Sequence, residues 1–213
     1  MKKNIYILLF ILLGGCTLNI PKIPLEDFFR NPEKSSFQLS PNGKKIAYMK
    51  PWDDGNRMMN VYIKDLGQEN GVRITSASKR SLYGYFWLND NRIAYIQDKG
   101  GDENIHIYAV DIDGSNDIDL TPFDNIQARI TDDLEDDPNH MIISINNRNP
   151  RIHDVYRLNV NSGELTLIAE NPGNIMGWMT DNDGKLRIAM TSDGVNSSIL
   201  YRDTEKDEFK PIL

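Results

Sequence analysis

An apolar doublet recurs along this chain at an almost constant interval. Each copy is followed by an aromatic or small residue, as in Ile46-Ala47-Tyr48, Ile93-Ala94-Tyr95, Ile142-Ile143-Ser144 and Ile188-Ala189-Met190. The first residues of successive copies are 47, 49 and 46 residues apart. A regular interval of this length indicates a chain built from repeated structural units, so the fold has to be one in which such units stack on each other.

Three further segments accompany each doublet. A second run rich in β-branched and aromatic residues lies at 61–65, 107–111, 155–159 and 199–203, and a third short run at 72–75, 118–121, 165–168 and 209–212. An opening strand precedes the doublet and ends in a turn such as Asn42-Gly43 or Asp183-Gly184, which are dipeptides that favour tight hairpins. Each unit therefore reads as a four-stranded antiparallel meander.

This pattern predicts an all-β protein, a partial β-propeller of about four four-stranded antiparallel blades. We expect the blades at 37–76, 84–122, 128–170 and 175–213. Four blades are the low end for a closed ring, and the last repeat reaches Leu213 inside its closing strand. Part of a larger propeller is therefore the favoured interpretation, and a small closed ring of four blades is the alternative.

The amino terminus has the features of an export signal. Lys2 and Lys3 precede an apolar run at 5–13, which is shorter than the roughly 20 residues that a membrane span needs. The run leads into Leu13, Gly14, Gly15 and Cys16, which resemble the lipobox of bacterial lipoproteins. We predict that 1–15 is a signal peptide and that Cys16 carries a lipid; an ordinary signal peptide and a signal anchor are the alternatives.

A lipid on Cys16 would hold the protein on a membrane of the bacterial cell envelope. Thr17 follows the cysteine, where an aspartate often retains lipoproteins in the inner membrane, so the outer membrane or the periplasmic side is preferred. Cys16 is the chain's single cysteine, which excludes a disulfide within the chain. Residues 16–36 are expected to be a linker, with a short helix around Leu25, Phe28 and Phe29.

The charge balance argues against nucleic acid as a partner. The formal net charge is −7 at pH 7. A protein that binds nucleic acid usually needs a positive surface, from which it gains affinity by releasing counterions. The 26% of charged residues and 39% of hydrophobic residues are those of an ordinary folded domain.

Few residues have the character of a catalytic or metal site. The three histidines are His106, His140 and His153, and no serine or cysteine has a recognisable activating context near them. We expect these histidines at solvated or strand-edge positions, too far apart to share a metal ion. The sequence therefore predicts no catalytic residue, no bound metal and no cofactor in this chain.

Two acidic segments are better explained as loops than as cation sites. Asp111–Asp117 alternates oxygen-bearing side chains, but Gly114 stands fourth instead of sixth and no glutamate stands twelfth, so a hairpin turn is expected. The run 132–137 contains five acidic residues and is expected to be a solvated loop, with attraction of cations or basic peptide ends as the alternative. Five aromatic residues at opening strands are expected to fill the space between blades: Tyr83, Tyr85, Phe86, Trp87 and Trp178.

Two segments resemble the start of serine peptidases of the prolyl oligopeptidase family (S9), of the acylaminoacyl peptidase or dipeptidyl peptidase type. They are IPLEDFFRNP at 23–32 and FQLSPNGKKIAY at 37–48. The second also occurs in TolB-type propellers, whereas the first favours the peptidases. The resemblance extends over essentially all of the chain from about residue 20 to 213.

The resemblance implies a propeller of seven or eight blades above an α/β-hydrolase domain, whose triad serine lies in a Gly-x-Ser-x-Gly turn. No Gly-x-Ser-x-Gly occurs in this sequence, so the family's catalytic residues cannot be assigned here and the chain alone is expected to be inactive. The propeller is expected to restrict access of oligopeptides to the active site of the complete protein. The alternative is a TolB-like envelope propeller that binds a protein partner.

Overall fold

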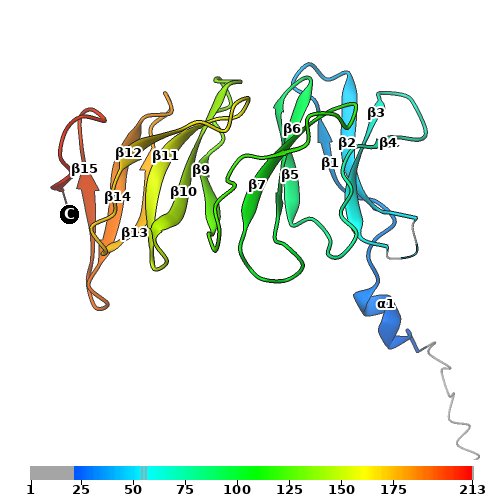
Figure 1. Cartoon of the computed structure of the whole chain (residues 1–213), viewed down its shortest axis with the longest axis horizontal. Helices are drawn as coiled ribbons and strands as arrows, with labels where there is room; N and C mark the ends of the chain where they lie inside the picture. The colour runs from blue at the N-terminus through cyan, green and yellow to red at the C-terminus, as the bar shows by residue number, and fades with distance from the viewer. Residues whose placement is uncertain (1–21, 54, 56, 213) are drawn as a thin grey trace, which may run out of the picture. The chain divides into compact units, whose positions relative to one another are not determined.

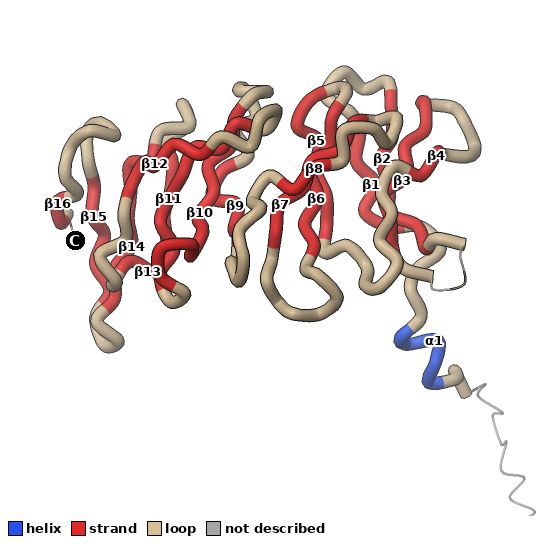
Figure 2. Tube along the Cα trace, in the orientation of Figure 1, coloured by secondary structure: helices blue, strands red, loops and turns tan. Residues whose placement is uncertain are grey.

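The structure is a computed structural model that describes residues 22–53, 55 and 57–212, and four sheets dominate it. Each sheet has four strands, and the strands pair antiparallel in the order in which they occur along the chain. Figure 1 shows the four sheets following one another in chain order, and Figure 2 shows the loops and turns that join their strands. The predicted all-β fold of four four-stranded antiparallel blades is confirmed.

The four sheets are called blades 1 to 4. Blade 1 consists of β1 (Ser35–Leu39), β2 (Lys45–Pro51), β3 (Met59–Asp65) and β4 (Val72–Arg73). Blade 2 consists of β5 (Gly84–Asn89), β6 (Arg92–Gln97), β7 (His106–Asp111) and β8 (Ile118–Asp119). Blade 3 consists of β9 (Ala128–Asp132), β10 (His140–Asn149), β11 (Ile152–Asn159) and β12 (Leu165–Ala169). Blade 4 consists of β13 (Ile175–Thr180), β14 (Leu186–Ser192), β15 (Ser197–Tyr201) and β16 (Lys210–Pro211).

The middle strands of the blades are apolar on both faces because a neighbouring blade can cover each face. In β6, Ile93 and Tyr95 point toward blade 1, and Ala94 between them points toward blade 3. Successive side chains of a strand alternate between the two faces, so a strand buried on both sides needs an unbroken apolar run. This requirement explains the recurring doublet in the sequence.

Three hydrophobic clusters join the blades in series. The first packs Met49 and Val61 of blade 1 against blade 2. The second joins blades 2 and 3 around Met141 and Leu158, and the third joins blades 3 and 4 around Ile142. A fully buried side chain of this size contributes about 1.5–3 kcal/mol to folding, so these clusters are the main source of cohesion between blades.

The closing strands of blades 1 and 2 are shorter than the four-residue segments that the sequence predicted. Each of these strands ends after two residues, because the side chain of a following threonine takes the place of a backbone carbonyl as the acceptor for the neighbouring strand. The Thr75 hydroxyl accepts from the Val61 amide at 2.9 Å, and the Thr121 hydroxyl accepts from the Ile107 amide at 3.1 Å. Hydrogen bonds between the third and closing strands therefore continue past the end of the backbone pairing, with a threonine hydroxyl as the acceptor.

The chain divides into two compact units, one that ends at Asn31 and one that begins at Pro32. The described part of this first unit contains α1 (Leu25–Phe29), the short helix that the spacing of its apolar residues predicted. The predicted lipobox residues Leu13, Gly14, Gly15 and Cys16 lie outside the described residues. Within the part of the chain that the structure describes, no helix is long and apolar enough to span a membrane.

Candidate functional site

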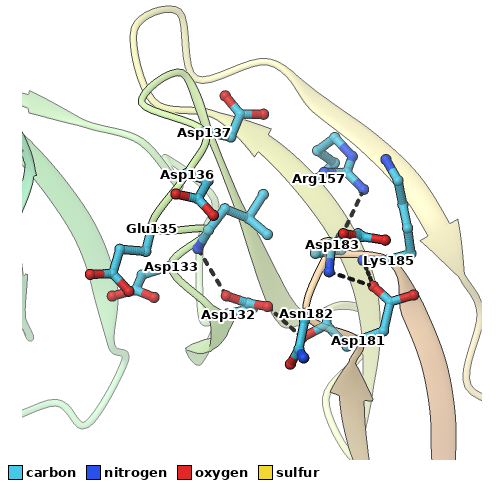
Figure 3. A pocket seen from close by; sticks show the side chains of 13 residues that line it. Asp132, Asp133, Glu135, Asp136, Asp137, Arg157, Asp181, Asn182, Asp183 and Lys185 are labelled. Carbon is cyan, nitrogen blue, oxygen red and sulfur yellow. Dashed lines mark hydrogen bonds between the residues drawn. The ribbon is translucent and has the colours of Figure 1, made fainter.

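An acidic pocket lies where blades 3 and 4 meet. It has a volume of about 570 Å³ and is lined by the loop 132–137, by residues 180–185 around the β13–β14 turn, and by Arg157. Figure 3 shows acidic side chains on the side of the β9–β10 loop, with Arg157 and Lys185 on the opposite side. The acidic run expected to be a solvated loop therefore forms one wall of a pocket.

Asp132 holds this wall in place through both of its carboxylate oxygens. One oxygen accepts the Leu134 amide at 2.9 Å, which closes a tight turn, and the other accepts the Thr180 hydroxyl of blade 4. Leu134 has a positive φ of 51° and places its side chain in the cluster between blades 3 and 4. The first acidic residue of the run is therefore a structural link between two blades.

Asp181 organises the opposite wall. Its carboxylate accepts the backbone amides of Asp183 at 3.0 Å and Lys185 at 2.8 Å, and it pairs with the Arg187 guanidinium at 2.7 Å. The hydrogen bond from Arg187 holds the pKa of Asp181 below its usual range, so this group stays ionised at neutral pH. The β13–β14 turn thus carries a fixed negative charge.

Asp137 closes the acidic run in a similar way. Burial opposes its ionisation, but hydrogen bonds from the Asn139 amide at 3.0 Å and the His140 ring at 3.0 Å outweigh burial and lower its pKa. His140 lies at the start of β10 and is half-buried, which agrees with the expected strand-edge position. The His140 ring therefore stabilises the loop through its contact with Asp137.

Four carboxylates of the pocket have no counter-charge among the described residues, namely Asp133, Glu135, Asp136 and Asp183. Arg157 pairs instead with Glu205 at 3.2 Å. No serine or cysteine lines the pocket, and within the described ranges no three His, Cys, Asp or Glu side chains are arranged to hold a metal ion. The negative charge of the pocket can therefore attract a cationic group.

His106 and His153 differ from the sequence expectation. His106 is buried on β7 instead of solvated, and its Nδ1 lies 2.9 Å from the Asp119 carboxylate, because blade stacking covers the start of the strand. His153 lies within β11 rather than before a strand, and burial lowers the pKa of its half-buried ring. Nε2 of His153 is buried and has no hydrogen-bond partner among the described residues. The three histidines have separate surroundings.

The segment Asp111–Asp117 forms the expected hairpin turn. The Gly114 amide donates to the Asp111 carbonyl at 2.8 Å, and the Ser115 amide donates to the Asp113 carboxylate at 2.9 Å. Asp117 accepts the Tyr95 hydroxyl at 2.7 Å. These oxygens are occupied by protein donors, which is the arrangement of a turn and not of a cation loop.

Four of the five aromatic residues singled out in the sequence contact the clusters between blades, as expected. Tyr85 is buried in the first cluster with Trp87 packed on it, Phe86 packs on the second cluster and Trp178 on the third. Tyr83 is the exception because it lies exposed, with its hydroxyl 3.2 Å from Asp98. Its place in a loop before β5 removes it from the stacked faces.

One ion pair in blade 3, between the buried Asp154 carboxylate and the exposed Arg148 side chain, was not predicted from the sequence. Both oxygens of Asp154 accept from the Arg148 guanidinium at 2.7 Å, and one of them also accepts the Asn171 amide at 2.8 Å. Burial disfavours the charged carboxylate, but these hydrogen bonds lower its pKa. The six-residue separation across the β10–β11 hairpin was the one available signal, and it became meaningful only once the hairpin register was known.

Comparison with known proteins places these features in context. No protein-family model matches the chain. It is 32% identical over 172 residues to dipeptidyl aminopeptidase BIII of Pseudoxanthomonas mexicana, which covers 80% of this chain and 24% of that protein. It is 27% identical over 195 residues to dipeptidyl peptidase family member 6 of Caenorhabditis elegans, which covers 87% of this chain and 26% of that protein. The chain spans about a quarter of the length of these curated relatives.

Solved structures share the fold. A prolyl endopeptidase structure superposes with a TM-score of 0.58 at 12% identity, covering 85% of this chain and 29% of that one. TolB of Acinetobacter baumannii superposes with a TM-score of 0.51 at 20% identity, covering 84% of this chain and 43% of that one. Both are similar to this chain in the arrangement of their blades.

Proposed function

Since this chain is a β-propeller portion of the prolyl oligopeptidase (S9) peptidase family, we propose that it acts as part of a propeller that limits access of oligopeptides to a peptidase active site. The observation that carries the proposal is the 32% identity to a dipeptidyl aminopeptidase over 80% of the chain. The active site itself belongs to a hydrolase domain outside these 213 residues, because the sequence contains no Gly-x-Ser-x-Gly turn. The propeller contributes shape and charge to such a protein.

The physical basis of the proposed gating is a rigid barrier of stacked sheets. A blade covered on both faces cannot open without exposing a hydrophobic cluster, so the stacked blades form a rigid wall beside the proposed active site. The unpaired carboxylates of the pocket between blades 3 and 4 add a negative field to one edge of this barrier. This field is expected to favour peptides with basic ends over acidic ones.

Labelling with a serine-directed reagent tests whether this chain carries an active site of its own. The purified full chain is incubated with a fluorophosphonate and with peptide and ester substrates, beside a complete S9 peptidase as positive control. We expect no label and no turnover from this chain, since no serine among the described residues is hydrogen-bonded to a histidine that could act as its base. Stoichiometric labelling of a serine in this chain would show that it carries its own active site.

A TolB-like envelope propeller that binds a protein partner remains the second candidate function. It is favoured less because the similarity to TolB is one of fold at 20% identity. The genomic DNA after codon 213 separates the two candidates. Further blades and a Gly-x-Ser-x-Gly turn there would support the peptidase, whereas a stop codon followed by an unrelated gene would support the binding module.

We also propose that the protein is exported and anchored in the bacterial envelope through a lipid on Cys16. The support is the sequence Leu13-Gly14-Gly15-Cys16 after a short apolar run. Intact mass of the membrane-extracted protein tests this proposal. We expect the mass of a chain that begins at Cys16 and carries acyl groups. The mass of a chain with Met1 still present and Cys16 unmodified would contradict the proposal.

A further inference from the structure

A second pocket lies at the other end of the junction between blades 3 and 4. It has a volume of about 540 Å³ and is lined by the start of β9, the β10–β11 turn and the segment that leads from blade 3 into β13. The acidic pocket lies instead at the far ends of β9 and β13. A volume of this size is in the range of pockets that hold small ligands. Both walls belong to blades that the chain itself contains.

The titratable side chains of this second pocket are all basic. They are Arg129, Arg151 and His153, and no aspartate or glutamate lines the pocket among the described residues. Both arginines are exposed, and within the described ranges neither guanidinium forms an ion pair with a carboxylate. This local charge is opposite in sign to the net charge of −7 of the whole chain. We call this surface the cationic pocket.

The strand register explains why these side chains meet. Arg129 pairs with Ser144 across β9 and β10, and Ser144 pairs with Val155 across β10 and β11. Val155 belongs to the hydrophobic cluster between blades 3 and 4. His153 lies two residues before Val155, and side chains alternate along a strand, so both lie on the same face of the sheet. Arg129 and His153 therefore face blade 4 together.

His153 brings an unpaired acceptor to the wall of the cationic pocket. Its ring donates a hydrogen bond to the Gln127 backbone, and Nε2 is buried with no hydrogen-bond partner among the described residues. Burial and the nearby Arg129 guanidinium lower the pKa of the ring, so it is neutral at pH 7 and Nε2 presents a lone pair. Buried polar atoms are nearly always paired, so an N–H group of a ligand fits this position once the exposed side chains around it shift.

We propose that the cationic pocket binds the C-terminal residue of a peptide. The carboxylate pairs with the guanidinium groups of Arg129 and Arg151, and the last peptide N–H donates to Nε2 of His153. Guanidinium groups match the geometry of a carboxylate. A C-terminal residue carries a carboxylate and an N–H on the same Cα, which fits a pocket where cations and an acceptor lie together. The choice of a peptide as the ligand rests on the proposed function.

Calorimetric titration of the purified full chain in detergent tests the need for a free carboxylate. The ligands are acetylated tetrapeptides of glycine and alanine, whose amino ends carry no charge that the acidic pocket could attract. One ends in a carboxylate, one in a carboxamide, and one in a carboxamide after an internal glutamate. We expect the free C-terminal carboxylate to bind at least roughly tenfold more tightly than either amide.

Two further measurements test the individual contacts. Arg129→Gln should weaken binding of the carboxylate peptide roughly tenfold, whereas Lys44→Gln, which removes a positive charge from an exposed position in the β1–β2 turn, should leave it unchanged. A peptide that ends in lactate instead of alanine keeps the carboxylate but lacks the last N–H, so it should bind the wild type roughly threefold or more weakly. In His153→Phe, the lactate and alanine peptides should bind equally.

The comparison of peptides on the wild-type chain needs no variant, and circular dichroism checks that each variant is folded. The proposal is overturned if no peptide binds, if an amide peptide binds as tightly as the carboxylate peptide, or if inorganic phosphate displaces that peptide as well as an unbound copy of it does. Folded Arg129→Gln with unchanged binding would overturn it too. None of these measurements uses peptidase activity, so their failure would reject the peptide site alone, whereas the sequence after codon 213 decides the proposed function.

Discussion

Gly184 shows how a single residue can serve two blades. It follows Asp183 in the β13–β14 turn at a φ of +67°, where a side chain is strained, and a Cβ atom there would collide with the Leu134 side chain. Leu134 is itself buried between blades 3 and 4. The turn therefore needs glycine for its backbone conformation and also for the contact between blades.

Gly184→Ala is predicted to destabilise the fold more than Gly43→Ala. Gly43 has nearly the same φ of +69° in the equivalent turn of blade 1, but nothing lies within 4 Å of a Cβ there. The backbone cost is therefore shared, and the collision with Leu134 adds about 1–2 kcal/mol. Urea unfolding of both variants measures the difference, and equal losses would show that Leu134 moves aside freely.

Asp154→Ala is predicted to lower the free energy of unfolding by about 1–3 kcal/mol, because the buried Asn171 amide loses its acceptor. The folded-state pKa of Asp154 is lowered, so its carboxylate stabilises the fold above the unfolded pKa of about 3.9 and that stability is lost as pH falls. The difference between wild type and variant should therefore shrink below about pH 4.

Denaturant unfolding from pH 3 to pH 7 checks this prediction. Asp65→Ala is the control, since Asp65 is exposed and pairs with Lys45 on the surface, where ion pairs contribute little. A gap between wild type and Asp154→Ala that stays constant over this pH range would mean that the ionised carboxylate is not what stabilises the hairpin.

At the scale of the element, the two middle strands of each blade carry most of the packing. β10 and β11 pair over most of their length, and the β10 residues Met141, Ile142 and Ile143 are all buried. Ile142 points toward blade 4, whereas its two neighbours point toward blade 2. One strand therefore links three blades.

Ile143→Ala is predicted to cost about 2–5 kcal/mol of unfolding free energy, because it removes buried side-chain atoms and leaves a cavity between blades 2 and 3. Leu167→Ala, on the outer strand of the same blade, should change stability by less than about 0.5 kcal/mol. Thermal and urea unfolding measure both values. Similar losses for the two variants would show that the contact between blades contributes little.

The closing strands show how far local patterns reach. Their positions were predicted from β-branched residues in the sequence, but the early ends of β4 and β8 were not. Those ends depend on the hydroxyl groups of Thr75 and Thr121, which replace backbone acceptors for the neighbouring strand. From the sequence alone, a threonine in a predicted strand does not show whether its backbone carbonyl or its side-chain hydroxyl accepts the hydrogen bond from the neighbouring strand.

At the scale of the whole molecule, stability should be highest in the middle blades. Blades 2 and 3 are covered on both faces by the clusters, whereas blades 1 and 4 are each covered on one. Local opening follows the number of buried contacts, so the outer blades open at lower free energy. Stacked repeat units behave in this way because each one contacts only its neighbours.

Hydrogen exchange is predicted to follow this gradient. Amides of β6, β7, β10 and β11 should exchange at least roughly tenfold more slowly than those of β15. The exchange rates of the unfolded chain serve as the reference. Equal protection in β15 and β10 would contradict a gradient set by blade coverage.

The sequence by itself determined the repeat, the number of blades and the order of strands. These follow from short-range physics: unbroken apolar runs at a constant interval require sheets buried on both faces, and the turn dipeptides between them set the meander. The resemblance in 23–48 also identified the peptidase family that the comparisons support.

The tertiary structure alone decided which side chains meet across blades. It buried His106, linked Asp132 to Thr180 and paired Asp154 with Arg148. It also left the side chains of Phe37 in blade 1 and Met190 in blade 4 exposed. These contacts depend on how one sheet stacks on the next, and residues far apart in sequence carry no local pattern that reveals their partners in such a stack.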